Sequence, residues 1–164
     1  MPDVSRRTLC LAVSSLAVLW LGLLIGVSFI STPVKFAAPT LELPVALDVG
    51  RVTFSLFSRI EWAMAALLLV NVLVARPSRA VASATLIAGL IVLVQALYLL
   101  PVLDERIAAV IAGSPQPSSA HHAIYVWLEA AKALLLASIA VLAIRAAVMQ
   151  PANPSASYRS RVTA

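Results

Sequence analysis

Four long apolar runs constrain the fold of this chain more than any other feature of its sequence. They cover about residues 9–30, 59–75, 80–100 and 122–149. A helix needs roughly 20 residues to cross about 30 Å of hydrocarbon, so each run is close to the length of one membrane span. Because a bilayer core offers no water, an isolated span must satisfy its backbone polar groups internally, as a helix does. The runs predict an all-α membrane protein built as a bundle of four transmembrane helices.

The composition leaves no room for a separate soluble domain. Hydrophobic residues make up 62% of the 164 residues and charged residues 12%, against roughly half and a quarter in ordinary globular domains. We assign residues 1–150 to the membrane domain. Residues 151–164 are mostly Pro, Ser, Ala and Arg, and we expect them to form a disordered cytoplasmic tail.

Basic residues are distributed unevenly between the two sets of span ends. One set carries basic residues almost free of acids, namely Arg6, Arg7, Arg76, Arg79, Arg145, Arg159 and Arg161. Lys and Arg next to a span are retained in the cytoplasm, so both termini are expected there, with the chain in a bacterial plasma membrane. The net charge of +5 is spread over span ends. This spread indicates contact with anionic lipids of the bilayer and argues against nucleic acid as a partner.

Prolines mark the two connections on the opposite side. The first connection, about residues 31–58, contains Pro33, Pro39 and Pro44, which favour turns or helix ends. After Pro44 the polar and apolar side chains follow helical spacing. This amphipathic helical stretch either lies at the outer interface or extends the second span outward. The second connection shows a short helical pattern over residues 101–112.

A polar stripe in the fourth run is the most informative functional feature. His122, Tyr125, Glu129 and Lys132 follow one another at i, i+3, i+7 and i+10, which places them within roughly 80° on a helix. A charge at bilayer depth costs at least about 2.5 kcal/mol, so the stripe should face protein or a water-filled cavity. Glu129 and Lys132 either form an ion pair that seats the helix or belong to a functional site. If Arg145 reaches the inner interface, Lys132 approaches the outer boundary; otherwise both residues are buried.

Glu61 is a second charged residue on an apolar helical face. It shares that face with Phe57, Met64 and Leu68, so it needs a partner inside the bundle, and Lys132 and His122 are the candidates. Gln95 and Tyr98 can add interhelical hydrogen bonds or anchor the third span at the interface. Gly22 and Gly26 form a Gly-x-x-x-Gly pattern, which favours close helix packing within the chain or between two copies.

The sequence offers little support for enzyme chemistry. His121 and His122 with Glu129 are a conceivable transition-metal set, but adjacent histidines point about 100° apart on a helix. We therefore interpret the histidine pair first as a titratable outer mouth and leave metal binding open. There is no phosphate loop, nucleotide fingerprint or serine triad, so no cofactor is expected. The single Cys10 has no partner for an internal disulfide.

Short motifs around the first connection resemble a known family. They are Gly26, Phe29, Pro33 and Phe36, followed by Gly50, Phe54 and Phe57 before the second run. In these residues the chain resembles the bacterial four-span group of unknown function related to transmembrane protein 205. The resemblance implies a multi-pass membrane protein and no established reaction.

Two functional classes follow from these patterns, and a third is weaker. A small transporter or accessory subunit would use Glu61, His122, Glu129 and Lys132 as a relay or gate, with Pro33 and Pro101 at mobile span ends. A structural or partner-binding membrane protein would use the same residues to fix helix register. A membrane-embedded metal or haem enzyme is the third possibility. Four spans are few for a complete transporter, so an active role implies a homo-oligomer or a larger membrane complex.

Overall fold

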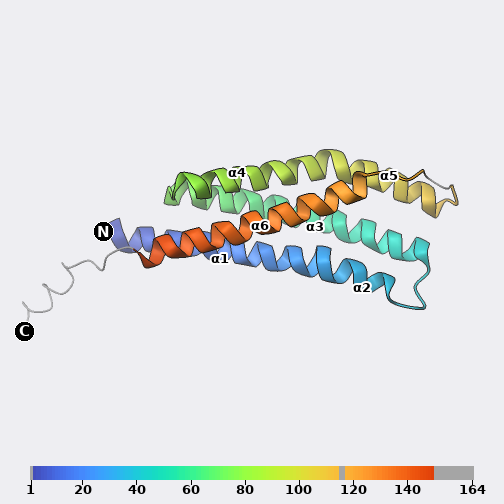
Figure 1. Cartoon of the computed structure of the whole chain (residues 1–164), viewed down its shortest axis with the longest axis horizontal. Helices are drawn as coiled ribbons and strands as arrows, with labels where there is room; N and C mark the ends of the chain where they lie inside the picture. Colours follow the sequence, from blue (N-terminus) through green and yellow to red (C-terminus); the bar gives the residue numbers. More distant parts are fainter. Residues whose placement is uncertain (1, 115–116, 150–164) are drawn as a thin grey trace, which may run out of the picture.

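The computed structural model describes residues 2–114 and 117–149, with side chains from residue 6 onward, and it is built from helices (Figure 1). In chain order these are α1 (Pro2–Leu24), η1 (Ile25–Ser31), α2 (Thr32–Phe36), α3 (Leu43–Ala75), α4 (Arg79–Val94), η2 (Gln95–Leu99), α5 (Leu100–Ile111) and α6 (His121–Val148). Four continuous helical segments are long and apolar enough to cross a membrane. The predicted all-α four-helix bundle is confirmed. The tail predicted for residues 151–164 lies outside the described residues.

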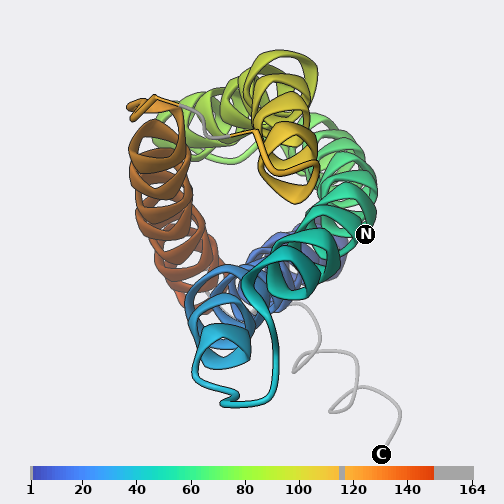
Figure 2. The same cartoon turned by 90° about the vertical axis from the view of Figure 1, so that its right-hand side faces the viewer.

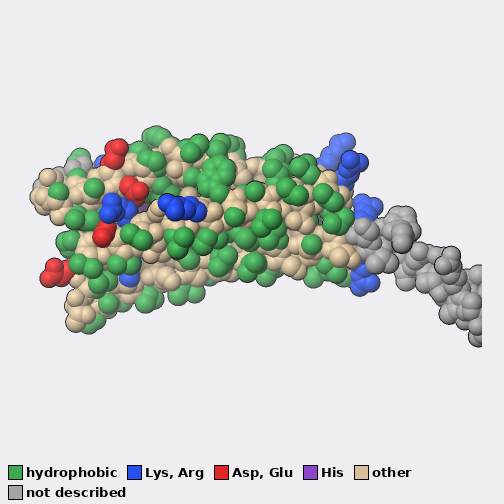
Figure 3. Space-filling view, turned by 180° about the vertical axis from the view of Figure 1, so that it is seen from behind, with side chains coloured by type: hydrophobic (Ala, Val, Ile, Leu, Met, Phe, Trp, Pro, Cys, Tyr) green, Lys and Arg blue, Asp and Glu red, His purple; other side chains and the backbone are tan. Residues whose placement is uncertain are grey.

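The four spans stand around a ring, as the end-on view in Figure 2 shows. α1 packs against α6 and α3, and α4 packs against α3 and α6. Short connections make successive spans antiparallel, so the start of α1, the turn from α3 to α4 and the end of α6 meet at one end (Figure 1). We call this part the terminal half and the opposite part the cavity half. On the face shown in Figure 3, Lys and Arg side chains gather at the terminal end, and both signs mix at the other end.

The spans are longer than the apolar runs. The second span begins at Leu43 rather than near residue 59, so the amphipathic stretch extends this span outward. Pro44 occupies the first turn of α3, where the missing backbone N–H costs nothing. The short helix predicted over residues 101–112 continues the third span as α5. The first connection therefore shrinks to residues 37–42.

Each of the two π-helical segments ends two residues before a proline. η1 precedes Pro33 and η2 precedes Pro101. A proline ring inside a helix collides with the carbonyl four residues back, and the wider π turn gives that carbonyl room. The backbone N–H of Thr32 donates to Val27, five residues back, and that of Leu100 donates to Gln95 in the same way. Both helices continue past these prolines, so the prediction that Pro101 lies at a span end is wrong, and Pro33 lies within the last turn of its span.

The chain contains an internal repeat with an interval of 68 residues. This interval separates Pro33 from Pro101 and Glu61 from Glu129. When η1 is shifted along the sequence by the same interval, it overlaps η2. Buried residues pair in the same register, including Val13 with Val81, Leu24 with Val92, Phe57 with Tyr125 and Leu68 with Leu136. One two-span unit, α1 to α3, is thus followed by a second, α4 to α6. Since successive spans are antiparallel, the two units run in the same direction, as in transporters with parallel repeats.

The terminal half of the bundle is packed mainly with apolar side chains. Buried residues of α1 recur every three or four positions, as expected for a helix with one packed face: Cys10, Val13 and Ala17 in this half, then Trp20 and Leu24 farther along the helix. Opposite them, α6 presents small residues such as Ala140 and Ala143, which let two helices approach closely. The Ser14 hydroxyl donates to the carbonyl of Ala140 at 3.0 Å. Close apolar packing and one hydrogen bond therefore hold α1 to α6 at this end.

Candidate functional site

A charged cluster lies inside the bundle, where the two repeat units meet. Lys132 Nζ is 2.5 Å from Glu61 Oε1 and 2.8 Å from Glu129 Oε1. The side chains of Lys132, Glu61 and Glu129 are 0%, 2% and 1% exposed. Glu129 and Lys132 are both buried among the helices, which agrees with the alternative in which both residues lie inside the bundle. Of the two partners predicted for Glu61, Lys132 forms the ion pair and His122 does not.

Gln95 bridges the ammonium and one carboxylate. Its amide oxygen accepts a hydrogen bond from Lys132 Nζ at 2.8 Å, and its amide nitrogen donates to Glu129 Oε1, also at 2.8 Å. The side chain is buried and projects from η2. Because Gln95 is the first residue of the π-helical segment, the local winding of η2 decides whether its amide faces the cluster.

Two donors from the first span complete the cluster, and the sequence patterns did not identify them. Trp20 Nε1 donates to Glu61 Oε1 at 3.1 Å, and the Ser28 hydroxyl donates to Glu129 Oε2 at 2.9 Å. Trp20 belongs to the repeating buried face of α1, and an indole at mid-span needs a hydrogen-bond acceptor. The need of this indole for an acceptor was the signal in the sequence that could have pointed to Trp20. With these donors the cluster draws on all four spans.

The charges of the cluster do not balance when every group is ionised. Two carboxylates face one ammonium, which leaves one negative charge in excess. The hydrogen-bond donors Trp20, Ser28 and Gln95 disperse that charge but do not cancel it. An uncompensated charge at bilayer depth costs at least about 2.5 kcal/mol. The cluster can therefore take up one proton or one small cation to become neutral.

The internal repeat explains the origin of the cluster and its asymmetry. Glu61 and Glu129 occupy equivalent positions of the two units. Lys132 stands where the first unit has Met64, and Gln95 stands where it has Val27. Two equivalent carboxylates thus share one lysine that only the second unit supplies. Sites at the interface of repeats are typical of membrane transporters.

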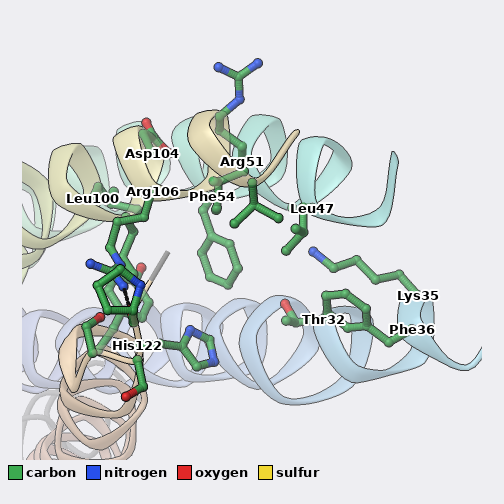
Figure 4. Close-up of a pocket in the computed structure, with 18 residues that line it drawn as sticks. Thr32, Lys35, Phe36, Leu47, Arg51, Phe54, Leu100, Asp104, Arg106 and His122 are labelled. Carbon is green, nitrogen blue, oxygen red and sulfur yellow. Dashed lines mark hydrogen bonds between the residues drawn. The ribbon is translucent and has the colours of Figure 1, made fainter. Parts of the chain in front are cut away.

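A cavity of about 480 Å³ lies at the end of the bundle away from the chain termini (Figure 4). We call it the end cavity. Residues of α2, α3, α5 and the beginning of α6 contribute to its walls. Tyr125 lines it, packs edge-on against Phe54 with ring centroids 5.5 Å apart, and lies one turn before Glu129 on α6. The end cavity thus comes within one helical turn of the charged cluster.

The remaining predicted residues lie outside the cluster. His122 lines the end cavity, and Tyr98 is 57% exposed with its ring 6.3 Å from that of His121. A Cβ atom added to Gly22 or Gly26 would meet nothing within 4 Å. Within the part of the chain that the structure describes, no helix packs closely on these glycines.

The possible transition-metal ligands proposed from the sequence, His121, His122 and Glu129, do not form a metal-binding group in the described residues. Within residues 2–114 and 117–149, no three His, Cys, Asp or Glu side chains come together as possible metal ligands. Glu129 faces Lys132 and Gln95 instead of the histidines. The two carboxylates and single ammonium of the cluster can bind a proton or a small cation.

The family model for a domain of unknown function, DUF4149, matches residues 15–114. The chain belongs to this family. The matched segment covers more than half of the chain and includes Trp20, Glu61 and Gln95, but it ends before α6, which carries Glu129 and Lys132. No curated protein and no solved structure matches the chain. The family assignment thus agrees with a multi-pass membrane protein and adds no reaction.

Proposed function

We propose that this protein is a small membrane transporter, or an accessory subunit of one, whose buried charged cluster binds and releases a proton. The observation that carries the proposal is the pair of buried carboxylates, Glu61 and Glu129, that share one ammonium, Lys132. With one proton bound the cluster is neutral and suited to a dry interior. Without it the cluster carries an excess negative charge that favours entry of water or a cation.

The π-helical segments supply an element that could respond to this change. Ser28 lies in η1 and Gln95 in η2, and both donate to Glu129. A π segment holds one residue more than an α-helical turn, so rewinding it rotates a side chain by about 100°. When the cluster carries its excess negative charge, the hydrogen bonds that Ser28 and Gln95 donate to Glu129 are charge-assisted and hold both segments in their present winding. Proton binding weakens them and favours rearrangement near Pro33 and Pro101.

Reconstitution tests the proposal directly. Full-length protein in liposomes is subjected to a potassium diffusion potential, and proton flux is followed with an internal pH-sensitive dye. We expect flux above that of empty liposomes and at least about a tenfold loss for Glu61→Gln or Glu129→Gln, because each removes one titrating carboxylate of the cluster. Glu105→Gln is the matched control, since Glu105 is exposed on α5. Flux equal to empty liposomes, or unchanged in both cluster variants, would contradict the proposal.

A structural role is the second candidate, and one observation favours it. The hydrogen bonds and ion pairs of the cluster connect all four spans. If the cluster only fixes helix register, mutating it would lower the stability of the protein, and the protein would produce no proton flux in liposomes. Stability and flux measured on the same variants therefore separate the two functions.

We also propose that the chain lies in a bacterial plasma membrane with both termini in the cytoplasm, and that its family is related to transmembrane protein 205. Arg6 and Arg7 before the first span, and Arg76 and Arg79 between the second and third, support this orientation. A reporter active only outside the cytoplasm should work when fused after Gln116 and fail when fused after Ser78. The reverse pattern would overturn the orientation.

Gly22 and Gly26 are the proposed contact between two copies of the chain. Cross-linking through Cys introduced at these positions tests this contact.

A further inference from the structure

We propose that the end cavity binds an amphiphilic anion, a molecule with a carboxylate or phosphate head and an apolar body. This site is separate from the buried cluster, and the inference does not depend on transport. It rests on cations without counter-charges, on a glycine that makes room for one of them, and on the apolar walls.

Lys35 and Arg106 are two cations on the wall of the end cavity that pair with no carboxylate in the described part of the chain. Lys35 Nζ lies 5.0 Å from the centre of the Phe36 ring, and Arg106 donates to the backbone oxygen of Pro117. Figure 4 shows the Lys35 side chain directed into the cavity, with Arg106 and His122 on the other side of the Phe54 ring. The wall thus offers positive groups free to bind an anion.

The other two charged residues of the wall do not balance these cations. Arg51 is held by Asp48, with an Nη2 to Oδ1 distance of 2.6 Å. In Figure 4 the side chains of Arg51 and Asp104 both point away from the cavity. The groups that face inward are therefore positive, which favours a negatively charged ligand.

Gly50 makes room for the Lys35 ammonium, which lies where a Cβ atom of residue 50 would be. A Cβ atom at this position would lie 2.1 Å from Lys35 Nζ, so any larger residue on α3 would displace the ammonium. The glycine has an ordinary helical place within α3, where it weakens the helix compared with alanine. Its effect is to let the ammonium settle against the backbone of α3, at the wall of the cavity.

The rest of the wall suits an apolar body. Leu47, Phe54, Leu100, Leu103, Ile107 and Val110 line the cavity. A volume of about 480 Å³ falls in the range of roughly 300–1,000 Å³ found for small-molecule sites, in which apolar walls surround a few polar groups. A ligand with its head at Lys35 and its chain along Phe54 would contact both the positive and the apolar parts of the wall.

Native mass spectrometry of the full-length protein in a non-ionic detergent tests the site, with dodecyl phosphate as the probe. We expect one saturable adduct, with no adduct from inorganic phosphate and at least about tenfold weaker binding of dodecanol, because the head and the chain are both recognised. Lys35→Gln should weaken dodecyl phosphate binding about tenfold, the usual effect of losing one charge-assisted contact. Arg59→Gln, which removes an exposed charge of α3 outside the cavity, should leave it unchanged.

A second pair of variants keeps the test independent of lysine chemistry. Gly50→Leu should fill the space beside Lys35 and weaken binding as strongly as Lys35→Gln. Gly89→Leu is the control, since nothing lies within 4 Å of a Cβ atom there. Equal binding of dodecanol and dodecyl phosphate, or binding unchanged in both Lys35→Gln and Gly50→Leu, would overturn the proposal. Competition by phosphatidylglycerol would assign the ligand to the bilayer, and competition by dodecanoate alone would assign it to free single-chain anions.

Discussion

The two halves of the bundle contain the same four spans and are held together by different forces. In the terminal half α1 and α6 meet through Val13, Ala17, Ile139 and Ala143, with one buried serine contact. In the cavity half the spans meet through two ion pairs, hydrogen bonds from four donors and a cavity of about 480 Å³.

This difference has a physical consequence. Lipid tails are as apolar as leucine, so helices in a membrane associate through close packing and polar contacts instead of hydrophobic burial. The α1–α6 contacts of the terminal half are made by apolar side chains that do not titrate, so this packing should not respond to pH. The charged cluster contains two carboxylates, and under the proposed function its charge changes when a proton binds. The proposed function thus assigns the response to protons to the cavity half and none to the terminal half.

Replacing the shared lysine should give the largest effect. Lys132→Met leaves two buried carboxylates without their ammonium, at a cost of about 3 to 5 kcal/mol in the free energy of unfolding. Unfolding in mixed micelles measures the loss, and Arg59→Met, which changes an exposed charge, is the control. Adding Glu61→Gln to Lys132→Met should recover part of the loss in a double-mutant cycle. Additive effects in that cycle would show that the pair contributes no coupling and that the two halves are alike in this respect.

Truncating the apolar core of the terminal half should give an intermediate effect. Leu136 is fully buried, and Leu136→Ala should cost about 2 kcal/mol, near the lower end of such truncations because a membrane reference state lacks the transfer term. Leu134→Ala is the matched control, since Leu134 is 72% exposed. Stability of Leu136→Ala should be the same at pH 5 and pH 8. A pH-dependent loss would break the distinction between the two halves.

Removing a single hydrogen bond from the cluster should give the smallest effect. Ser28→Ala removes the donor to Glu129 Oε2, and interhelical hydrogen bonds in membranes average about 0.6 kcal/mol. Ser138→Ala, which removes a hydroxyl bonded only to its own helix at Leu134, should cost less. If proton transport is present, Ser28→Ala should change its rate more than its small stability effect suggests. Unchanged flux would limit the role of η1 to structure.

The span count and the polar faces could be predicted from the sequence, because both depend on local patterns. Run length identified the four spans, and helical spacing put Glu129 and Lys132 on one face and Glu61 on the core side of the second span. The span ends could not be fixed in this way. Pro33 and Pro101 signal breaks by their local chemistry, whereas the helices absorb each proline in a π-helical segment.

The sequence by itself determined the class of protein, the number of spans and the need for Glu61 to find a partner, since charges cannot remain alone in hydrocarbon. The tertiary structure decided which partner that is, because helical spacing gives a face but not the distance between two helices. It placed Lys132 within 2.5 Å of Glu61 and left His122 at the end cavity. It also brought in Trp20 and Ser28, whose roles depend on the packing of α1 against its neighbours. Contacts between spans arise from packing in three dimensions, and no periodicity within one span contains them.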